Sequence, residues 1–158
     1  MGFALSEMTL TSSAFEPGGR IPIEHTGDGE DVSPALAWRD APDGTASFAV
    51  ICHDPDAPLV KPGTYGFVHW ALYGIPGSAT GLAPGTAEYV QGVNDFGRQG
   101  YGGPAPPDGH GTHHYFFWLL ALDAAPDLPP GLTMWELLDA VEPHLIGMNR
   151  LVGTYSRV

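Results

Sequence analysis

The chain has 158 residues and a formal net charge of −12, with six lysines and arginines in total, so it is long enough for one domain around one hydrophobic core. A surface this acidic repels nucleic-acid phosphates and anionic lipid, which excludes nucleic acid as a natural partner. The 22 glycines and 16 prolines are spread along the sequence, a pattern typical of short strands joined by tight turns.

Apolar runs bounded by turn residues predict a series of short strands within a single domain over residues 1–158. The predicted strands, in chain order, are 21–23, 36–38, 47–53, 67–73 and 115–122, with a final strand or extended segment at 151–155. The segment 115–122 is apolar on both faces, which predicts a central strand covered on both sides and favours a β-sandwich.

One helix is indicated near the C-terminal end. Thr133 and Glu136 have the spacing of a capping box, and an apolar stripe follows until Pro143 stops or kinks the helix. A second short helical turn is expected through Leu145 and Met148. The stretch 77–111 is rich in glycine and proline and predicts long loops, which in compact domains are commonly functional or mobile.

The single cysteine, Cys52, excludes an internal disulfide and a cysteine-based zinc cluster. It lies in an apolar run, where an inert buried thiol is expected. No apolar run is long enough to span a membrane and no signal-peptide pattern is present, so we expect a cytoplasmic protein without stable membrane insertion. Residues 1–6 match the N-myristoylation pattern, which is short and common by chance, and we give it no weight.

Acidic, imidazole and phenol side chains gather at the ends of the predicted strands. Asp54 follows the run 47–53, His69 lies near the start of the next strand, and His113 and Tyr115 are two residues apart, so they share one face of a strand. Such groups are costly to bury unpaired, so we expect them to converge on one pocket. Imidazole and phenol donors suit a small anion, and its affinity should rise as the pH falls through the histidine range.

Other interpretations of these residues were weighed. The sequence Asp-Pro-Asp also occurs in ordinary turns, and a histidine at a strand end is often a plain surface residue. A zinc site built from His69, His110, His113 or His114 is a minority alternative, because neighbouring strand residues point to opposite faces. No Gly-x-Ser-x-Gly nucleophile elbow is present, and the glycine-rich stretch 97–103 lacks the Gly-Lys-Ser/Thr ending of a phosphate-binding loop.

Several blocks of sequence carry a family resemblance. In order, they are DVSPALAW at 31–38, DPDAP at 54–58, FVHW at 67–70, NDFG at 94–97, GYGGP at 100–104, PP at 106–107, HHY at 113–115 and LVGTY at 151–155. Together they resemble the phosphatidylethanolamine-binding proteins, in the bacterial and archaeal group also called Raf kinase inhibitor-like. The resemblance implies a mainly β fold, with a large central antiparallel sheet packed on a smaller one and short peripheral helices.

The resemblance also implies a surface pocket for small anions. Its anion-binding residues would be Asp54, His69, His113 and Tyr115, and its wall would include Asp56, Ala105 and Pro107. Pro55, Pro58, Pro106 and Pro107 would keep the loop walls rigid. The family usually has arginine where this chain has His114; on the opposite face of the strand, that change should spare the ligand and alter a salt bridge instead.

The function implied is that of a non-catalytic binding or regulatory module for phosphate or a phospholipid head group such as phosphoethanolamine, with no cofactor and no metal. The alternative is a hydrolase, or a protease or kinase inhibitor, acting through the same His/Asp pocket. A protein partner and a homodimer stay open at this point.

Overall fold

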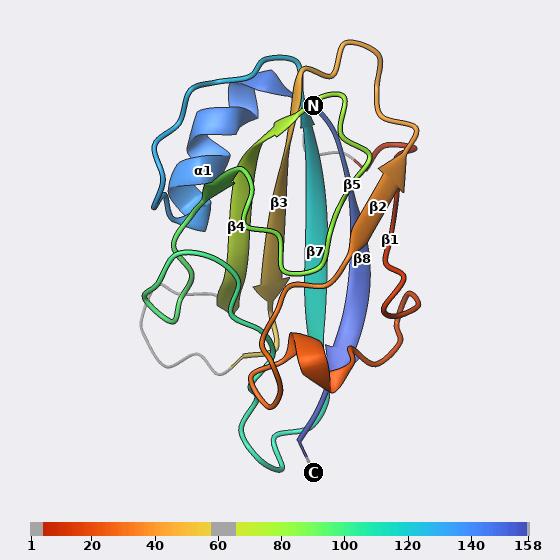
Figure 1. Ribbon diagram of the computed structural model, residues 1–158, viewed down its shortest axis with the longest axis vertical. Helices are drawn as coiled ribbons and strands as arrows, with labels where there is room; N and C mark the ends of the chain where they lie inside the picture. The colour runs from red at the N-terminus through yellow and green to blue at the C-terminus, as the bar shows by residue number, and fades with distance from the viewer. Residues whose placement is uncertain (1–4, 58–65, 158) are drawn as a thin grey trace.

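The computed structural model describes residues 5–57 and 66–157, which form two antiparallel sheets and one helix (Figure 1). The five-stranded sheet has the order β6-β4-β3-β7-β8, and the three-stranded sheet has the order β1-β2-β5. The large sheet contains β3 (Ser47–Asp54), β4 (Phe67–Pro76), β6 (Val90–Gln91), β7 (His113–Leu122) and β8 (Leu145–Tyr155). The small sheet contains β1 (Thr9–Thr11), β2 (Leu36–Arg39) and β5 (Gly81–Leu82). The predicted mainly β fold is confirmed.

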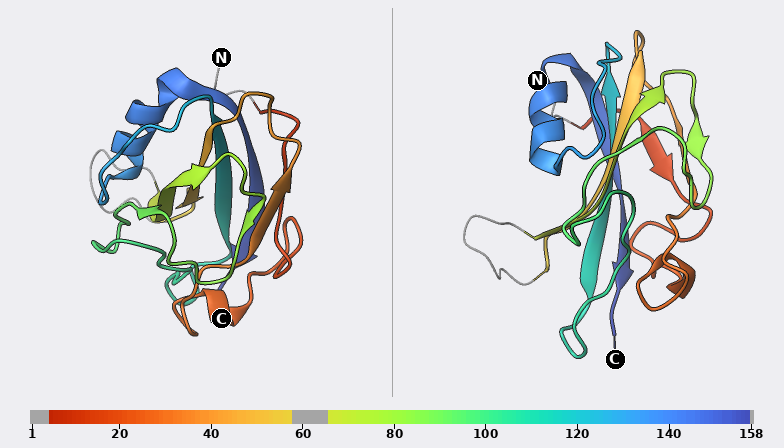
Figure 2. Two further views of the ribbon diagram at one scale, coloured as in Figure 1. Left: turned by 45° about the horizontal axis from the view of Figure 1, so that its top comes forward. Right: turned by 60° about the vertical axis from the view of Figure 1, so that its left-hand side comes forward.

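The large sheet separates two hydrophobic cores. The small sheet packs on one of its faces and α1 (Met134–Val141) on the other, as the right-hand view of Figure 2 shows. Phe48 and Phe117 point into the core between the sheets, whereas Leu137 of α1 is buried against the opposite face. Each such side chain contributes about 1.5–3 kcal/mol when fully buried.

Strand order brings the sequence-predicted site residues together. β3 lies between β4 and β7 and runs antiparallel to both, so its C-terminal end adjoins the N-terminal ends of its neighbours. Asp54 pairs with Phe67 at the start of β4, and His53 pairs with Phe116 near the start of β7. The last residue of β3 and the first residues of β4 and β7 therefore meet at the same end of the sheet.

The helix begins as the sequence predicts. Thr133 accepts a hydrogen bond from the Glu136 amide at 3.1 Å, and the Glu136 carboxylate accepts one from the Thr133 amide at 3.0 Å. This capping box satisfies two of the amide groups that a helix start leaves without partners. Pro143 then lies in a short 3₁₀ turn, η2 (Glu142–His144), which leads into β8.

Two predicted elements are wrong. Residues 21–23 do not form a strand: Ile21 donates one backbone hydrogen bond to Thr154, and Ile23 then begins a 3₁₀ turn, η1 (Ile23–His25), because Pro22 has no amide hydrogen to continue a ladder. The helical turn expected through Leu145 and Met148 is part of β8, which pairs with β7 over nearly its whole length. Long-range pairing there overrides a weak local helical pattern.

Coverage of β7 also differs from the prediction. Its inner residues Tyr115, Phe117 and Leu119 are buried, but Phe116 and Trp118 on the opposite face are only half-buried. The strand is central, as predicted, yet α1 covers only part of that face (Figure 2). No helix in the described ranges is long and apolar enough to cross a membrane.

Candidate functional site

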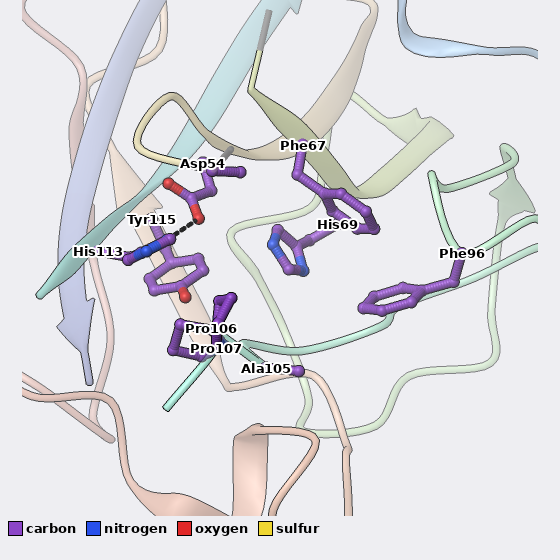
Figure 3. Close-up of a pocket in the computed structure, with 10 residues that line it drawn as sticks. Asp54, Phe67, His69, Phe96, Ala105, Pro106, Pro107, His113 and Tyr115 are labelled. Atoms are coloured by element: carbon purple, nitrogen blue, oxygen red, sulfur yellow. Dashed lines mark hydrogen bonds and ion pairs between the residues drawn. The ribbon is translucent and has the colours of Figure 1, made fainter. Parts of the chain in front are cut away.

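A small cavity opens where the ends of β3, β4 and β7 meet, with a volume of about 100 Å³ (Figure 3). Its lining consists of Asp54, Ala57, Phe67, His69, Phe96, Ala105, Pro106, Pro107, His113 and Tyr115. The structure therefore brings together all four residues expected to bind the anion and two of the three expected in the wall.

Asp54 and His113 form the buried ionisable pair of this cavity. His113 Nδ1–H donates to Asp54 Oδ2 at 2.7 Å, and each side chain is about 3% exposed. Asp54 Oδ1 accepts a second hydrogen bond, from the Asp56 amide at 2.7 Å. Because a carboxylate can only accept, this contact fixes the proton of neutral His113 on Nδ1.

A third residue extends the pair to the surface. Nδ1 of the exposed His110 lies 2.6 Å from Nε2 of His113. With one hydrogen on His113, that hydrogen lies on Nδ1 toward Asp54, and Nε2 then accepts from His110 Nδ1–H. A line of hydrogen bonds thus runs from the buried carboxylate to the surface, and both nitrogens of His113 are already engaged.

His69 is held differently. Its Nδ1–H donates to the Gly102 carbonyl at 2.6 Å, and the ring lies against Phe67, Phe96 and Tyr115 at centroid distances of 4.8, 5.7 and 5.2 Å. Burial lowers the pKa of His69 from 6.5 to about 4. The ring is therefore neutral near pH 7.

Gly103 secures the segment that carries this carbonyl. Its amide donates to Asp31 Oδ1 at 2.6 Å, and the amide of Gly102 donates back to the His69 carbonyl at 2.9 Å. A Cβ at Gly103 would collide with the backbone carbonyl of His25, so a side chain is excluded there. Asp31 and Gly103 therefore position the residue that orients His69.

Tyr115 supplies the hydroxyl of the cavity. Burial, and after it the negative charge of Asp54, raises the pKa of Tyr115 well above its usual range. The phenol keeps its proton and can donate it to a ligand. His113 and Tyr115 lie on the same face of β7, with their rings 6.4 Å apart, as strand alternation predicts.

Asp56 and Pro55, both predicted for the wall, do not line the cavity. The Asp56 carboxylate points to the other side of the strand, where Oδ2 accepts from the His114 amide at 2.8 Å and from His114 Nδ1–H at 2.7 Å. His114 lies on the face of β7 opposite His113, as predicted, and its exposed side chain pairs with Asp56. Pro58, another predicted wall residue, lies outside the described residues.

Several contributors to the site were missed from the sequence. Phe67 and Phe96 form an apolar wall around His69, and His110 contacts His113. Phe67 occupies the first position of β4, two residues before His69 on the same face, so strand alternation could have indicated it. Phe96 and His110 lie in loops, whose conformation carries no such periodic signal.

The polar side chains of the cavity are one carboxylate (Asp54), two imidazoles (His69 and His113) and one phenol (Tyr115). Within residues 5–57 and 66–157, no group of three or more histidine, cysteine or acidic side chains is arranged to hold a metal ion. Cys52 is fully buried, and burial raises the pKa of its thiol well above the usual range. It is therefore an inert core thiol, as expected.

Comparisons with known proteins agree with this architecture. The family model described as phosphatidylethanolamine-binding protein matches residues 11–156. A UPF0098 protein of Methanothermobacter thermautotrophicus is 43% identical over 157 residues, which cover 95% of this chain and 99% of that protein. A Mycobacterium tuberculosis protein named as a lipoprotein, LppC, is 42% identical over 156 residues, which cover 96% of this chain and 74% of that protein. The crystal structure of CT736, a phosphatidylethanolamine-binding protein homologue from Chlamydia trachomatis, superposes with a TM-score of 0.89 at 36% identity and covers 96% of this chain and 98% of that one.

Proposed function

We propose a function for the chain as a member of the phosphatidylethanolamine-binding protein family, to which it belongs by its match over residues 11–156. Membership supports a module of the binding type. The finer proposal is that the cavity binds a small oxyanion, such as phosphate or the phosphoryl part of a phospholipid head group, without turnover. The observation that carries it is the convergence of His69, His113 and Tyr115 with Asp54 on one cavity at the surface.

The size of the cavity supports a small ligand. Its volume of about 100 Å³ corresponds to a few water molecules, each of which occupies about 30 Å³ in the liquid. Pockets for drug-sized ligands are typically about 300–1,000 Å³. A tetrahedral oxyanion therefore fits, and the rest of a larger ligand would extend past Pro107 and Phe96 into solvent.

The lining supports binding over covalent catalysis. Among the described lining residues there is no serine, threonine, cysteine or lysine that could serve as a nucleophile. Tyr115 holds its proton too firmly for that role.

One observation favours the alternative of a hydrolase. The line Asp54–His113–His110 resembles the carboxylate–imidazole pair with which hydrolases activate a hydroxyl or water. A panel of phosphomonoesters, carboxylic esters and peptides decides the matter. Turnover that disappears in an Asp54→Asn variant would establish an enzyme, and its absence across the panel supports a binding module.

Phosphoethanolamine titrated into the protein by calorimetry tests the proposed function. His69→Ala should weaken binding by roughly tenfold or more, because it removes a hydrogen bond to a charged group. His114→Ala is the matched control, since that histidine is exposed on the opposite face of the strand. Equal affinity in the wild type and in His69→Ala, or an equal loss in His114→Ala, would place the ligand elsewhere.

A cytoplasmic location belongs to the same proposal. The mycobacterial relative LppC is named as a lipoprotein, a name that indicates a membrane anchor in LppC itself. Membrane anchoring is therefore the alternative location to test for this chain. Fractionation of cells that express this chain, with detection in the soluble and membrane fractions, separates the two locations.

A further inference from the structure

We propose that the cavity selects an oxyanion that carries its own proton, such as the monoanion of phosphate or of a phosphate monoester. The hydroxyl group of this ligand donates a hydrogen bond to Nε2 of His69, which stays neutral. The inference rests on the proposed function and adds to it the protonation state of the ligand. It means that binding of a phosphate monoester near neutral pH takes up one proton from solution.

The tautomer of His69 is the first step. The Gly102 carbonyl can only accept, so Nδ1 of His69 must carry the hydrogen of the 2.6 Å contact. A neutral imidazole has a single N–H, and Nε2 is therefore an acceptor. No protein hydrogen bond engages Nε2 within the described part of the chain, and the ring faces the side where Asp54, His113 and Tyr115 lie (Figure 3).

The Gly102 carbonyl disfavours the other tautomer of His69, in which Nε2 carries the hydrogen. Turning the ring hydrogen to Nε2 would bring the lone pair of Nδ1 against the Gly102 carbonyl oxygen, which is repulsive. The carbonyl cannot easily turn away, because Gly103 is bound to Asp31 at 2.6 Å and has no room for movement against His25. The lowered pKa of His69 agrees with a ring that stays neutral.

Other donors in the cavity are few. His113 donates to Asp54 through Nδ1, and its Nε2 is engaged by His110 Nδ1 at 2.6 Å, so neither nitrogen is left for a ligand. Pro106 and Pro107 have no amide hydrogen. Tyr115 remains as the side-chain donor among the described lining residues, beside the backbone amides of Ala57 and Ala105. None of these donors satisfies the acceptor on His69, so an oxyanion with no proton of its own would face that acceptor without a partner there.

The charge around the cavity points the same way. No lysine or arginine is found among the described lining residues, whereas the carboxylate of Asp54 is one of them. Two guanidinium groups outside the lining are paired with carboxylates, Arg98 with Asp31 at 3.3 Å and Arg157 with Asp28 at 2.6 Å. The titratable groups around His69 are His53 and Asp54 of β3, His113 and Tyr115 of β7, and Asp95 and Arg98 of the loop after β6. A second negative charge on the ligand gains no cation here and is repelled by Asp54.

A pair of ligands matched in shape and charge tests the proposal. Phosphoethanolamine as its phosphate monoanion carries a P–OH group, whereas ethanolamine O-sulfate has the same shape and the same single negative charge on the ester but no such proton. At pH 5.5, the sulfate ester should bind at least about tenfold more weakly, because a buried acceptor is left unsatisfied. Equal affinity of the two esters would overturn the proposal.

The pH profile gives a second readout. Phosphoethanolamine affinity should be constant below the second ionisation of the ester, near pH ~6, and should fall about tenfold for each pH unit above it. Calorimetry at pH 7.5 in buffers of different ionisation enthalpy should show the uptake of one proton. A flat profile without proton uptake would leave the proposed function intact and overturn this inference, whereas no binding of phosphoethanolamine at any pH would contradict the proposed function itself.

Three variants assign the effect to a residue. His69→Ala removes the acceptor altogether, so the preference for the phosphate ester should shrink to within about threefold and the pH slope should flatten. His114→Ala and Lys61→Gln should keep the wild-type preference; Lys61 is included because it lies among residues 58–65, which the structure does not describe. Loss of the preference in Lys61→Gln, or its retention in a folded His69→Ala protein, would overturn the assignment to His69.

Discussion

His113 is engaged at both ring nitrogens, and the character of each partner determines which nitrogen carries the proton. Asp54 can only accept and also receives the Asp56 amide, so its two oxygens are both committed. His110 is then the group that adapts, because a neutral imidazole can donate or accept at Nδ1. Asp54 therefore sets the polarity of the whole line of hydrogen bonds.

An Asp54→Asn substitution should reverse the tautomer of His113. The amide oxygen must face the Asp56 N–H, which leaves the amide NH₂ facing His113, so Nδ1 has to accept and the proton moves to Nε2. The ¹⁵N chemical shifts of His113 in two-dimensional NMR report the change directly, and His114 in the same spectra serves as an internal control. Retention of the proton on Nδ1 in the variant would mean that the side chain does not keep the contacts described for Asp54.

The sequence predicts the four central residues of the site for a physical reason. Asp54, His69, His113 and Tyr115 lie on or at the ends of strands, where alternation fixes which way a side chain points. Asp56 and its neighbours lie in a turn, whose conformation depends on contacts that are distant in sequence, and its assignment to the wall is wrong. His110, likewise in a loop, has no periodic signal that relates it to His113.

At the scale of elements, β7 offers a direct comparison of its two faces. Phe117 is fully buried between the sheets, whereas the neighbouring Trp118 is half-buried beside α1, with Phe116 stacked at 5.9 Å and Arg150 5.5 Å from its ring. Phe117→Ala should destabilise the fold by ~3–5 kcal/mol, and Trp118→Ala by about half as much, because less apolar area is lost. Urea unfolding of both variants measures the difference; an equal or larger loss in Trp118→Ala would show that the α1 face is covered more fully than described.

The elements that the sequence predicts well are those with strong local signals. β2, β3, β4 and β7 follow from apolar runs between turn residues, and α1 follows from its capping box. β1, β5 and β6 have two or three residues each and exist only because a partner strand from elsewhere in the chain pairs with them. Such pairing leaves no periodic pattern, which is also why the start of β8 is mistaken for a helical turn.

At the scale of the whole molecule, the net charge of −12 and the buried His69 have opposite effects on how stability depends on pH. Lowering the pH neutralises carboxylates and relieves their mutual repulsion, which favours the compact state. The same change disfavours folding through His69, because the folded pocket resists the proton that the unfolded chain accepts. The two effects oppose each other, so the pH dependence of the wild-type protein alone assigns neither.

The contribution of His69 can be isolated with a His69→Gln variant, which keeps every carboxylate. Unfolded His69 binds its proton near pH 6.5 and folded His69 only near pH 4, so between these values the unfolded state holds more protons and the free energy of unfolding falls with falling pH. The loss is about 1.4 kcal/mol per pH unit, or roughly 3 kcal/mol over the whole interval. Urea unfolding at steps from pH 7 to pH 4.5, in buffer without oxyanions, should therefore show the stability of the variant rising relative to the wild type by about 2–3 kcal/mol as the pH falls. Since the charges on all other groups are common to both proteins, parallel curves would mean that His69 takes up its proton equally well in the folded and unfolded chain, and that the pocket does not hold it neutral.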